Sequence, residues 1–390
     1  MSEVEAYSRN KLIDYLNLPP LDIEICDVTL RDGEQTPGVV FTRDEKVALA
    51  TELDNVGVDI IEAGFPVVSS AEKNIVKEIA NMGLNAKTCC LSRSVIGDVE
   101  TAVDCDVDFI SIFIAMSELH LKYKYHKSYE EMFASAMSAI EYAKEHGVGV
   151  RFAAEDGTRT DVEVLKEAFI AAEDYKVDYV SIADTIGILN PSTTHYLVSE
   201  IKKVVHTPIC IHCHNDLGLA TANTLAAAEA GAKQLHTTVN AIGERAGNAS
   251  LEELIVALRV QYGIARYDTT RLVKLSKMVN EFSGIRPAVN KAIVGENAFS
   301  HESGIHVCAI LEEPRTYELF SPEMVGGIRH LIVGKHTGTK ALRGIVKSMG
   351  YELEREQLCM LLDKIKNCTE AKKGIPPSRL DEMIRDICRF

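Results

Sequence analysis

Long apolar runs, basic patches and a secretion signal are all missing from this sequence of 390 residues. Its apolar stretches are strand-sized and fall far short of the roughly 18 residues of a membrane-spanning helix, so we expect no membrane span. Acidic residues outnumber basic ones by 57 to 42, and the net charge of −15 argues against nucleic acid or a membrane surface as a partner. The N-terminal segment is polar and acidic, unlike a signal peptide.

Disulfides and structural zinc are not expected either. Without a secretion signal, the ten cysteines are predicted to be reduced thiols of a cytoplasmic protein. Cys210 and Cys213 have C-x-x-C spacing, but no second pair follows, and residues three apart on one strand face opposite ways. A zinc ribbon is therefore disfavoured, and buried apolar thiols are the better interpretation.

A strand-then-helix pattern starts at residue 23 and occurs eight times. The eight strand-like runs are 23–30, 58–65, 86–92, 107–116, 148–156, 177–185, 208–216 and 232–240. Alternating strands and helices predict a parallel sheet, and eight units predict an α/β fold of the (β/α)₈ TIM barrel type. An open doubly wound sheet is the alternative. It is disfavoured by the count of units and because no Gly-rich G-x-G-x-x-G or Walker loop follows any strand.

Local signals mark the ends of several of the predicted helices. The S/T-x-x-E capping box, which begins helices, is found at Thr42–Glu45, Ser69–Glu72, Ser128–Glu131 and Thr160–Glu163. Glycines that end helices are found before the next strand at Gly57, Gly147 and Gly231.

The strand-then-helix pattern stops near residue 265. We therefore expect an N-terminal extension over 1–22, a catalytic barrel over 23–264 and a smaller, mostly helical C-terminal subdomain over 265–390, with no separate regulatory domain. Within it, helical patterns cover 354–367 and 378–389. No long linker precedes this subdomain, so we expect it to pack tightly on its own barrel or on that of a neighbouring subunit.

Polar side chains gather at the carboxyl ends of the predicted strands, where the active site of such a barrel lies. They are Arg31, Asp32, Glu62, Ser117, His120, Glu155, Asp156, Asp184, Thr185, His212, His214 and Asn240. Stability alone does not require this distribution, so these residues are candidates for chemistry.

The stretch ICIHCHND (209–216) places His212 and His214 on one face of a strand, because side chains two apart point the same way. A lone strand histidine is usually a hydrogen-bonded core residue. Two such histidines at a strand end, together with the carboxylate of Asp32, predict a metal site that leaves positions open for substrate. Glu62 is the competing carboxylate, but it is expected to pair with Arg31.

The stretch RFAAED (151–156) places Arg151, Ala153 and Glu155 on one face of the fifth strand. A buried guanidinium needs a carboxylate partner. Two interpretations of Arg151 stay open with equal weight: it binds a carboxylate of a dicarboxylic substrate, or it forms an internal ion pair with a barrel acid.

Four motifs reveal a family resemblance: TLRDGEQTPG (29–38), HCHND (212–216), GERAGNASLEEL (243–254) and SGIHV (303–307). They resemble the signature motifs of the 2-isopropylmalate and homocitrate synthase family, and the likeness covers about residues 23–340. Members of that family are metal-dependent TIM-barrel enzymes that condense acetyl-CoA with a 2-oxo acid.

The resemblance implies roles for individual residues. The binding set consists of Asp32, His212 and His214 for a divalent metal ion (Mg, Mn or Zn), and of Arg31, Gln35 and Thr185 for the 2-oxo acid. Glu155, His306 and Tyr317 fall on positions that the family uses for proton transfer, with Glu155 or His306 as the base. In the family, a partner subunit contributes the segment with the last two residues, which implies a homodimer.

Departures from the family pattern favour one branch of it. Lysine-pathway homocitrate synthases have Ser where Ala153 stands and His where Cys89 stands, so this sequence is more similar to the short homocitrate synthases of coenzyme or cofactor pathways. The expected reaction joins acetyl-CoA to 2-oxoglutarate or a longer 2-oxo diacid and hydrolyses the thioester. The first alternative is synthesis of 2-isopropylmalate or citramalate. A second is an acyl-CoA lyase, which is disfavoured because the related lyases have a cysteine where GERAGN has none. A third is a metal-binding paralogue without catalytic activity.

Overall fold

The computed structural model describes residues 6–370, 375 and 377–388. The chain divides into two compact units, Lys11–Arg286 and Met1–Asn10 with Pro287–Phe390. This division differs from the boundaries expected from the sequence at 22 and 264. The helix Leu272–Ser283 (α10) packs against Arg43–Val56 (α1) and thus belongs to the barrel unit.

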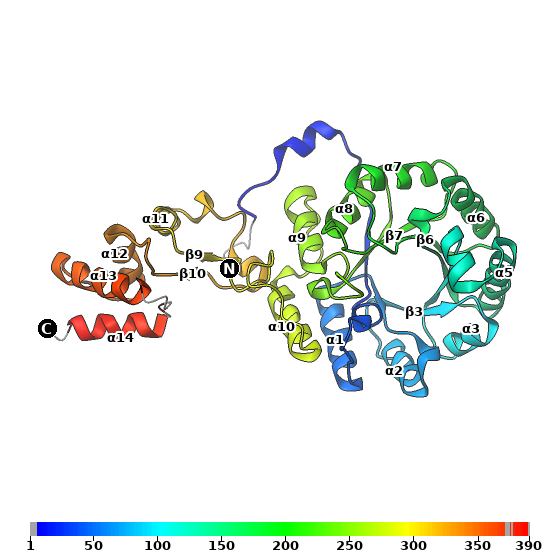
Figure 1. Ribbon diagram of the computed structural model, residues 1–390, viewed down its shortest axis with the longest axis horizontal. Helices are drawn as coiled ribbons and strands as arrows, with labels where there is room; N and C mark the ends of the chain where they lie inside the picture. Colours follow the sequence, from blue (N-terminus) through cyan, green and yellow to red (C-terminus); the bar gives the residue numbers. More distant parts are fainter. Residues whose placement is uncertain (1–5, 371–374, 376, 389–390) are drawn as a thin grey trace. The chain divides into compact units, whose positions relative to one another are not determined.

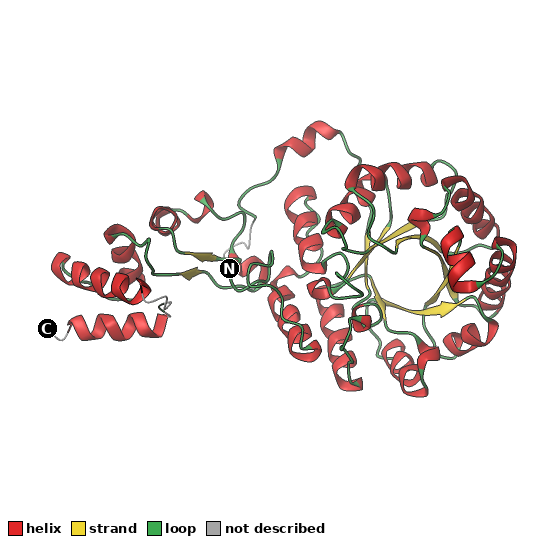
Figure 2. Ribbon diagram, viewed as in Figure 1, coloured by secondary structure: helices red, strands yellow, loops and turns green. Residues whose placement is uncertain are grey.

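The larger unit is a closed barrel of eight parallel strands in sequence order, as predicted. Figure 2 shows the ring of strands surrounded by helices. The strands are β1 Glu24–Asp27, β2 Ile60–Glu62, β3 Lys87–Arg93, β4 Phe109–Ala115, β5 Gly149–Glu155, β6 Tyr179–Asp184, β7 Ile209–Cys213 and β8 Gln234–Thr237.

Helices cover the outside of the barrel (Figure 1). Besides α1 and α10, they are α2 Ser70–Ala80, α3 Ile96–Val103, α5 Tyr129–Glu145, α6 Val162–Asp174, α7 Pro191–Lys202, α8 Ala220–Ala230 and α9 Leu251–Tyr262. A single helical turn, α4 Glu118–His120, lies in the loop after β4. Short 3₁₀ turns are η1 Lys11–Leu16, η2 Gly33–Gln35, η3 Pro66–Val68, η5 Gly157–Arg159, η6 Val239–Ala241 and η7 Thr269–Arg271, and Leu121–Tyr125 (η4) is a π-helical turn.

The predicted helix ends are mostly correct. Thr42 and Ser128 form complete capping boxes, and the Ser69 side chain accepts the backbone N–H of Glu72. The box predicted at Thr160 is wrong. Asp161 caps α6 instead, because the Thr160 hydroxyl donates to the backbone carbonyl of Asp156.

Inward-facing side chains of the barrel stack in layers of four from alternate strands, which is the packing of a barrel with a shear of about eight. The strand register places Cys26, Cys89, Arg151 and Cys210 of the odd-numbered strands in one layer. The next layer toward the carboxyl ends comes from the even-numbered strands and holds Glu62, Ser111, Ser181 and His236. The side chains of this second layer are buried, and they fill the interior between the first layer and the mouth.

The smaller unit is mostly helical. Its elements are β9 Ser300–His301, α11 Gly304–Glu312, η8 Pro314–Thr316, η9 Pro322–Val325, β10 His330–Leu331, α12 Thr339–Ser348, α13 Arg355–Glu370 and α14 Pro377–Cys388. Strands β9 and β10 pair in parallel, and the buried apolar faces of α12, α13 and α14 form a core of their own. Among the described residues, no helix combines the length and the apolar character that crossing a bilayer requires.

Candidate active site at the mouth of the barrel

A cavity of about 300 Å³ opens among the barrel strands. Eight residues proposed from the sequence line it: Arg31, Asp32, Gln35, Arg151, Glu155, Thr185, His212 and His214. Parallel strands bring these side chains together although they span nearly 200 positions of the chain. The remaining two, His306 and Tyr317, belong to the smaller unit. There His306 lies on α11, Tyr317 follows η8, and their rings stack with centroids 3.9 Å apart.

Asp32, His212 and His214 form a compact group of donor atoms. His212 lies on β7, and His214 follows the strand end, where it forms a β-bridge with Asn248. The two Nε2 atoms are 3.2 Å apart, and Oδ2 of Asp32 lies 3.7 Å from the first and 4.0 Å from the second. Two ligand atoms about 2.1 Å from one ion and at right angles to each other would lie about 3.0 Å apart, so the two imidazoles fit a shared metal ion.

The charge states of this group also suit a cation. Burial lowers the pKa of His212 to about 3, although the Asp32 carboxylate opposes that shift. Burial lowers the pKa of His214 as well. Burial would raise the pKa of Asp32, but the Arg31 guanidinium and the two imidazoles outweigh it and hold that pKa well below its usual value. Two neutral imidazoles and one carboxylate are the donor set that divalent ions bind.

Two side chains orient the Asp32 carboxylate. Arg31 forms an ion pair with Oδ1, and Nδ2 of Asn248 donates to Oδ2 at 2.7 Å. Asn248 is therefore a functional candidate that the sequence reasoning missed, although it lies in the GERAGN motif. The sequence pattern on β7 predicts the ligands, whereas Asn248 approaches from the loop after β8.

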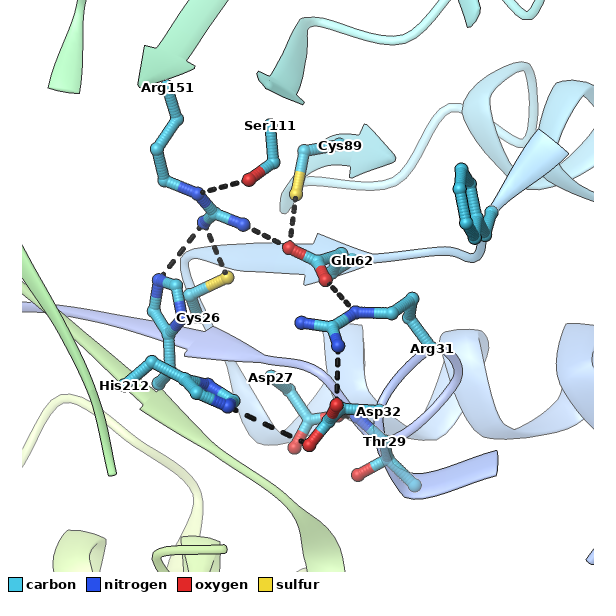
Figure 3. A network of polar contacts seen from close by, with 12 residues as sticks. Cys26, Asp27, Thr29, Arg31, Asp32, Glu62, Cys89, Ser111, Arg151 and His212 are labelled. Atoms are coloured by element: carbon cyan, nitrogen blue, oxygen red, sulfur yellow. Dashed lines mark hydrogen bonds and ion pairs between the residues drawn. The ribbon is translucent and has the colours of Figure 1, made fainter. Parts of the chain in front are cut away.

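A chain of buried ion pairs connects this group to the interior (Figure 3). Glu62 pairs with Arg31, as predicted, and it also pairs with Arg151. Burial would raise the pKa of Glu62, but the two guanidinium groups overcome this effect and lower it. Of the two interpretations of Arg151, the internal ion pair is the one present in the structure. A contact with substrate stays a prediction, because Arg151 also lines the cavity.

Glu155 is held at the cavity wall by the π-helical turn η4. Its carboxylate accepts from Nζ of Lys124 at 2.5 Å and from the hydroxyl of Tyr125 at 2.9 Å. His120 lies 3.8 Å from the same carboxylate. Burial, followed by the charge of Glu155, raises the pKa of Tyr125 well above its usual value, so this phenol stays protonated and donates.

Three other candidates use their side chains in hydrogen bonds within the protein. Thr185 lines the cavity, but its hydroxyl accepts the backbone N–H of Asp156 at 2.8 Å. Asp184 accepts the backbone N–H groups of Ile188 and Leu189, which shapes the loop after β6. The side chain of Asn240 bonds to Ser276 on α10.

The sequence reasoning missed several residues that line the cavity: Ser111, Lys124, Ser181, His236 and Arg245. A signal for His236 was present, because QLHT on β8 alternates polar inward residues just as ICIHC does on β7. Its ring lies 5.5 Å from that of His212, and burial lowers its pKa well below the usual value.

Comparison with known families and proteins extends the resemblance over the whole chain. The HMGL-like family model matches residues 22–279, and the model described as homocitrate synthase post-HMGL domain-like matches residues 293–373. Homocitrate synthase AksA of Methanosarcina mazei is 70% identical over 389 residues, which cover 99% of this chain and 96% of that protein. The 2-isopropylmalate synthase of Methanocaldococcus jannaschii is 46% identical over 97% of this chain and 74% of its own length.

A solved structure supports the fold alone. Hydroxymethylglutaryl-CoA lyase from Pseudomonas aeruginosa superimposes with a TM-score of 0.61 at 22% identity, over 70% of this chain and 96% of the lyase.

Proposed function

This chain belongs to the HMGL-like family, and from that premise we propose that it works as a homocitrate synthase. It is an acyltransferase that condenses the acetyl group of acetyl-CoA with 2-oxoglutarate, or with a longer 2-oxo diacid, and hydrolyses the thioester to release CoA. Two homocitrate synthases of Methanosarcina are 69–70% identical to it, whereas a 2-isopropylmalate synthase and a citramalate synthase of Methanocaldococcus jannaschii are 46% and 44% identical.

The charge balance of the cavity supports a dicarboxylic substrate. Arg31 and Arg151 carry two positive charges, and their partners Asp32 and Glu62 carry two negative ones. A divalent cation and a doubly charged 2-oxo diacid also cancel, so the occupied site stays neutral. A monocarboxylic 2-oxo acid would leave one buried positive charge uncompensated, which costs free energy because the charge is withdrawn from water.

The residues of the cavity divide the work of a carbon–carbon condensation. Asp32, His212 and His214 would hold the divalent ion, which polarises the ketone of the 2-oxo acid as a Lewis acid when bound. Glu155 lines the cavity and is the candidate base for a methyl proton of acetyl-CoA, with His306 as the alternative. The methyl carbon then attacks the ketone carbon, and the Arg31 guanidinium stabilises the negative oxygen that forms.

The test is acetyl-CoA-dependent thiol release with a panel of 2-oxo acids: 2-oxoglutarate, 2-oxoadipate, 2-oxoisovalerate and pyruvate. We expect a dicarboxylic acid to give the highest kcat/KM, and Asp32→Ala serves as the inactive control. A wild type that prefers 2-oxoisovalerate or pyruvate would overturn the homocitrate synthase proposal in favour of isopropylmalate or citramalate synthesis. That outcome would leave the barrel fold and the proposed metal-binding role of Asp32, His212 and His214 unchanged.

Three finer points belong to the same proposal. The ion is Mg, Mn or Zn, and activity after chelation and addition of each metal distinguishes them. A homodimer is supported by the resemblance of segment 303–307 to one that a partner subunit contributes in the family. A cytoplasmic location is supported by the ten cysteines, which are free thiols in the structure.

A further inference from the structure

Arg151 has little capacity left for a substrate. A guanidinium has five N–H donors. Nε donates to Ser111 at 3.1 Å, Nη1 lies 2.6 Å from Oε1 of Gln234 and 3.0 Å from Nε2 of His236, and Nη2 donates to Glu62. These contacts use four of the five N–H groups. Arg151 can therefore offer a carboxylate only one N–H, rather than the two parallel bonds of a bidentate pair.

The layer above Arg151 contains two serine hydroxyls whose protons make no hydrogen bond within the described part of the chain. Glu62 is an acceptor, and the Nε2 atom of His236 already contacts Arg151. The free Nδ1 of His236 is buried away from the cavity surface. Ser111 accepts from Arg151 and keeps its own hydroxyl proton, and the Ser181 hydroxyl has no hydrogen-bond partner among the described residues. Both serines line the cavity.

Their position suits the far end of an extended substrate. Ser111 lies on β4 and Ser181 on β6, so they flank Arg151 on β5 within the wall of the barrel. In a closed ring of eight strands β5 stands opposite β1, which leads to Asp32. Asp32 thus lies across the cavity from Arg151. His212, on β7 beside β6, lies two residues nearer the mouth than Cys210, the register partner of Ser181, so the two hydroxyls lie deeper in the cavity than the metal-binding group. The small side chain of Ala153, paired in register with Ser181, leaves room between them.

We propose that Ser111 and Ser181 determine specificity for the diacid, by donating their hydroxyl protons to the carboxylate at the far end of the 2-oxo acid. Arg151 supplies positive charge and one N–H from below, while the hydroxyls supply the directed hydrogen bonds. This inference rests on the proposed function, because a monocarboxylic acid has no second carboxylate to contact. It assigns the two serines as specificity-determining residues of the same cavity.

The experiment compares wild type with Ser111→Ala and Ser181→Ala in steady-state kinetics. A hydrogen bond to a charged group supports a rise of roughly 10- to 100-fold in KM for 2-oxoglutarate in each variant. The kcat should stay within about 3-fold, and the KM for acetyl-CoA should not change, because chemistry at the methyl and ketone carbons is untouched. Ser181→Thr, which keeps a hydroxyl, should restore most of the affinity.

Ser92→Ala is the matched control. Ser92 is a buried strand serine on β3 whose hydroxyl donates to the backbone carbonyl of Arg93, outside the cavity. It should leave both KM values unchanged. Circular dichroism checks that each variant is folded.

The outcomes separate the two proposals. A wild type that turns over only monocarboxylic acids refutes the proposed function and, with it, the role of the serines. A wild type that turns over 2-oxoglutarate while both alanine variants keep its KM leaves the proposed function standing and overturns the inference. A KM that rises equally for 2-oxoglutarate and 2-oxobutyrate also overturns it, because the second acid has no far carboxylate.

Discussion

The environment of Asp27, at the end of β1, predicts how the stability of the protein changes with pH. Its carboxylate is fully buried, accepts the backbone N–H of Thr29 at 2.9 Å through Oδ1, and leaves Oδ2 without a partner. Burial raises its pKa from 3.8 to about 7, and the nearby charges of Glu252 and Glu62 add to the rise. The folded state thus favours the protonated carboxyl, whereas the unfolded chain ionises near its ordinary value.

The sign of the effect on stability follows from proton binding. Between pH 4 and 7 the folded state binds more protons than the unfolded state, so the free energy of unfolding falls as the pH rises. At about 1.4 kcal/mol per pKa unit, the loss between pH 5 and pH 8 is about 2–3 kcal/mol. Asp27→Asn keeps an acceptor for Thr29 and removes the ionisation, so it should abolish this loss.

Thermal unfolding of wild type and Asp27→Asn, followed by circular dichroism in the presence of a chelator, measures the difference. Relative to wild type, the variant should gain about 5 °C in Tm on going from pH 5 to pH 8, at about 2 °C per kcal/mol for a unit of this size. Asp44→Asn, on an exposed side chain of α1, controls for the substitution itself. A Tm difference between Asp27→Asn and wild type that is the same at both pH values would refute a carboxyl that is neutral in the folded state.

Three further predictions concern the site. His212→Ala and His214→Ala should each abolish turnover and lower bound metal while the circular dichroism spectrum is kept, and full metal content in both would contradict the ligand assignment. If His306 acts across a subunit boundary, mixing His306→Ala with Asp32→Ala subunits should restore some activity, because a mixed dimer holds one intact site. If subunit exchange is verified and no activity returns, the site is built within one chain. Arg151→Ala should lower kcat/KM for 2-oxoglutarate by roughly 10²–10³-fold and barely affect 2-oxobutyrate, whereas an equal loss for both acids would mark Arg151 as purely structural.

The fold was predictable because its signals are local. The capping boxes at Thr42 and Ser128 involve only residues three apart, and Gly57 and Gly231 end α1 and α8 in the left-handed conformation that glycine adopts at no steric cost. Alternation along 209–214 predicted that His212 and His214 share a face, and their Nε2 atoms do meet. The box at Thr160 failed because a loop contact with Asp156 took its hydroxyl.

What the sequence alone determined is therefore the set of strands and helices, the inward face of each strand and the end of the barrel where polar residues gather. The tertiary structure decided which inward side chains meet. Arg151 bonds to Glu62, Ser111 and Gln234, which lie 40 to 89 residues away on three other strands. These partners depend on the closure and shear of the whole barrel, which bring together layers from alternate strands. No local pattern encodes that register, because it arises from packing all eight strands at once.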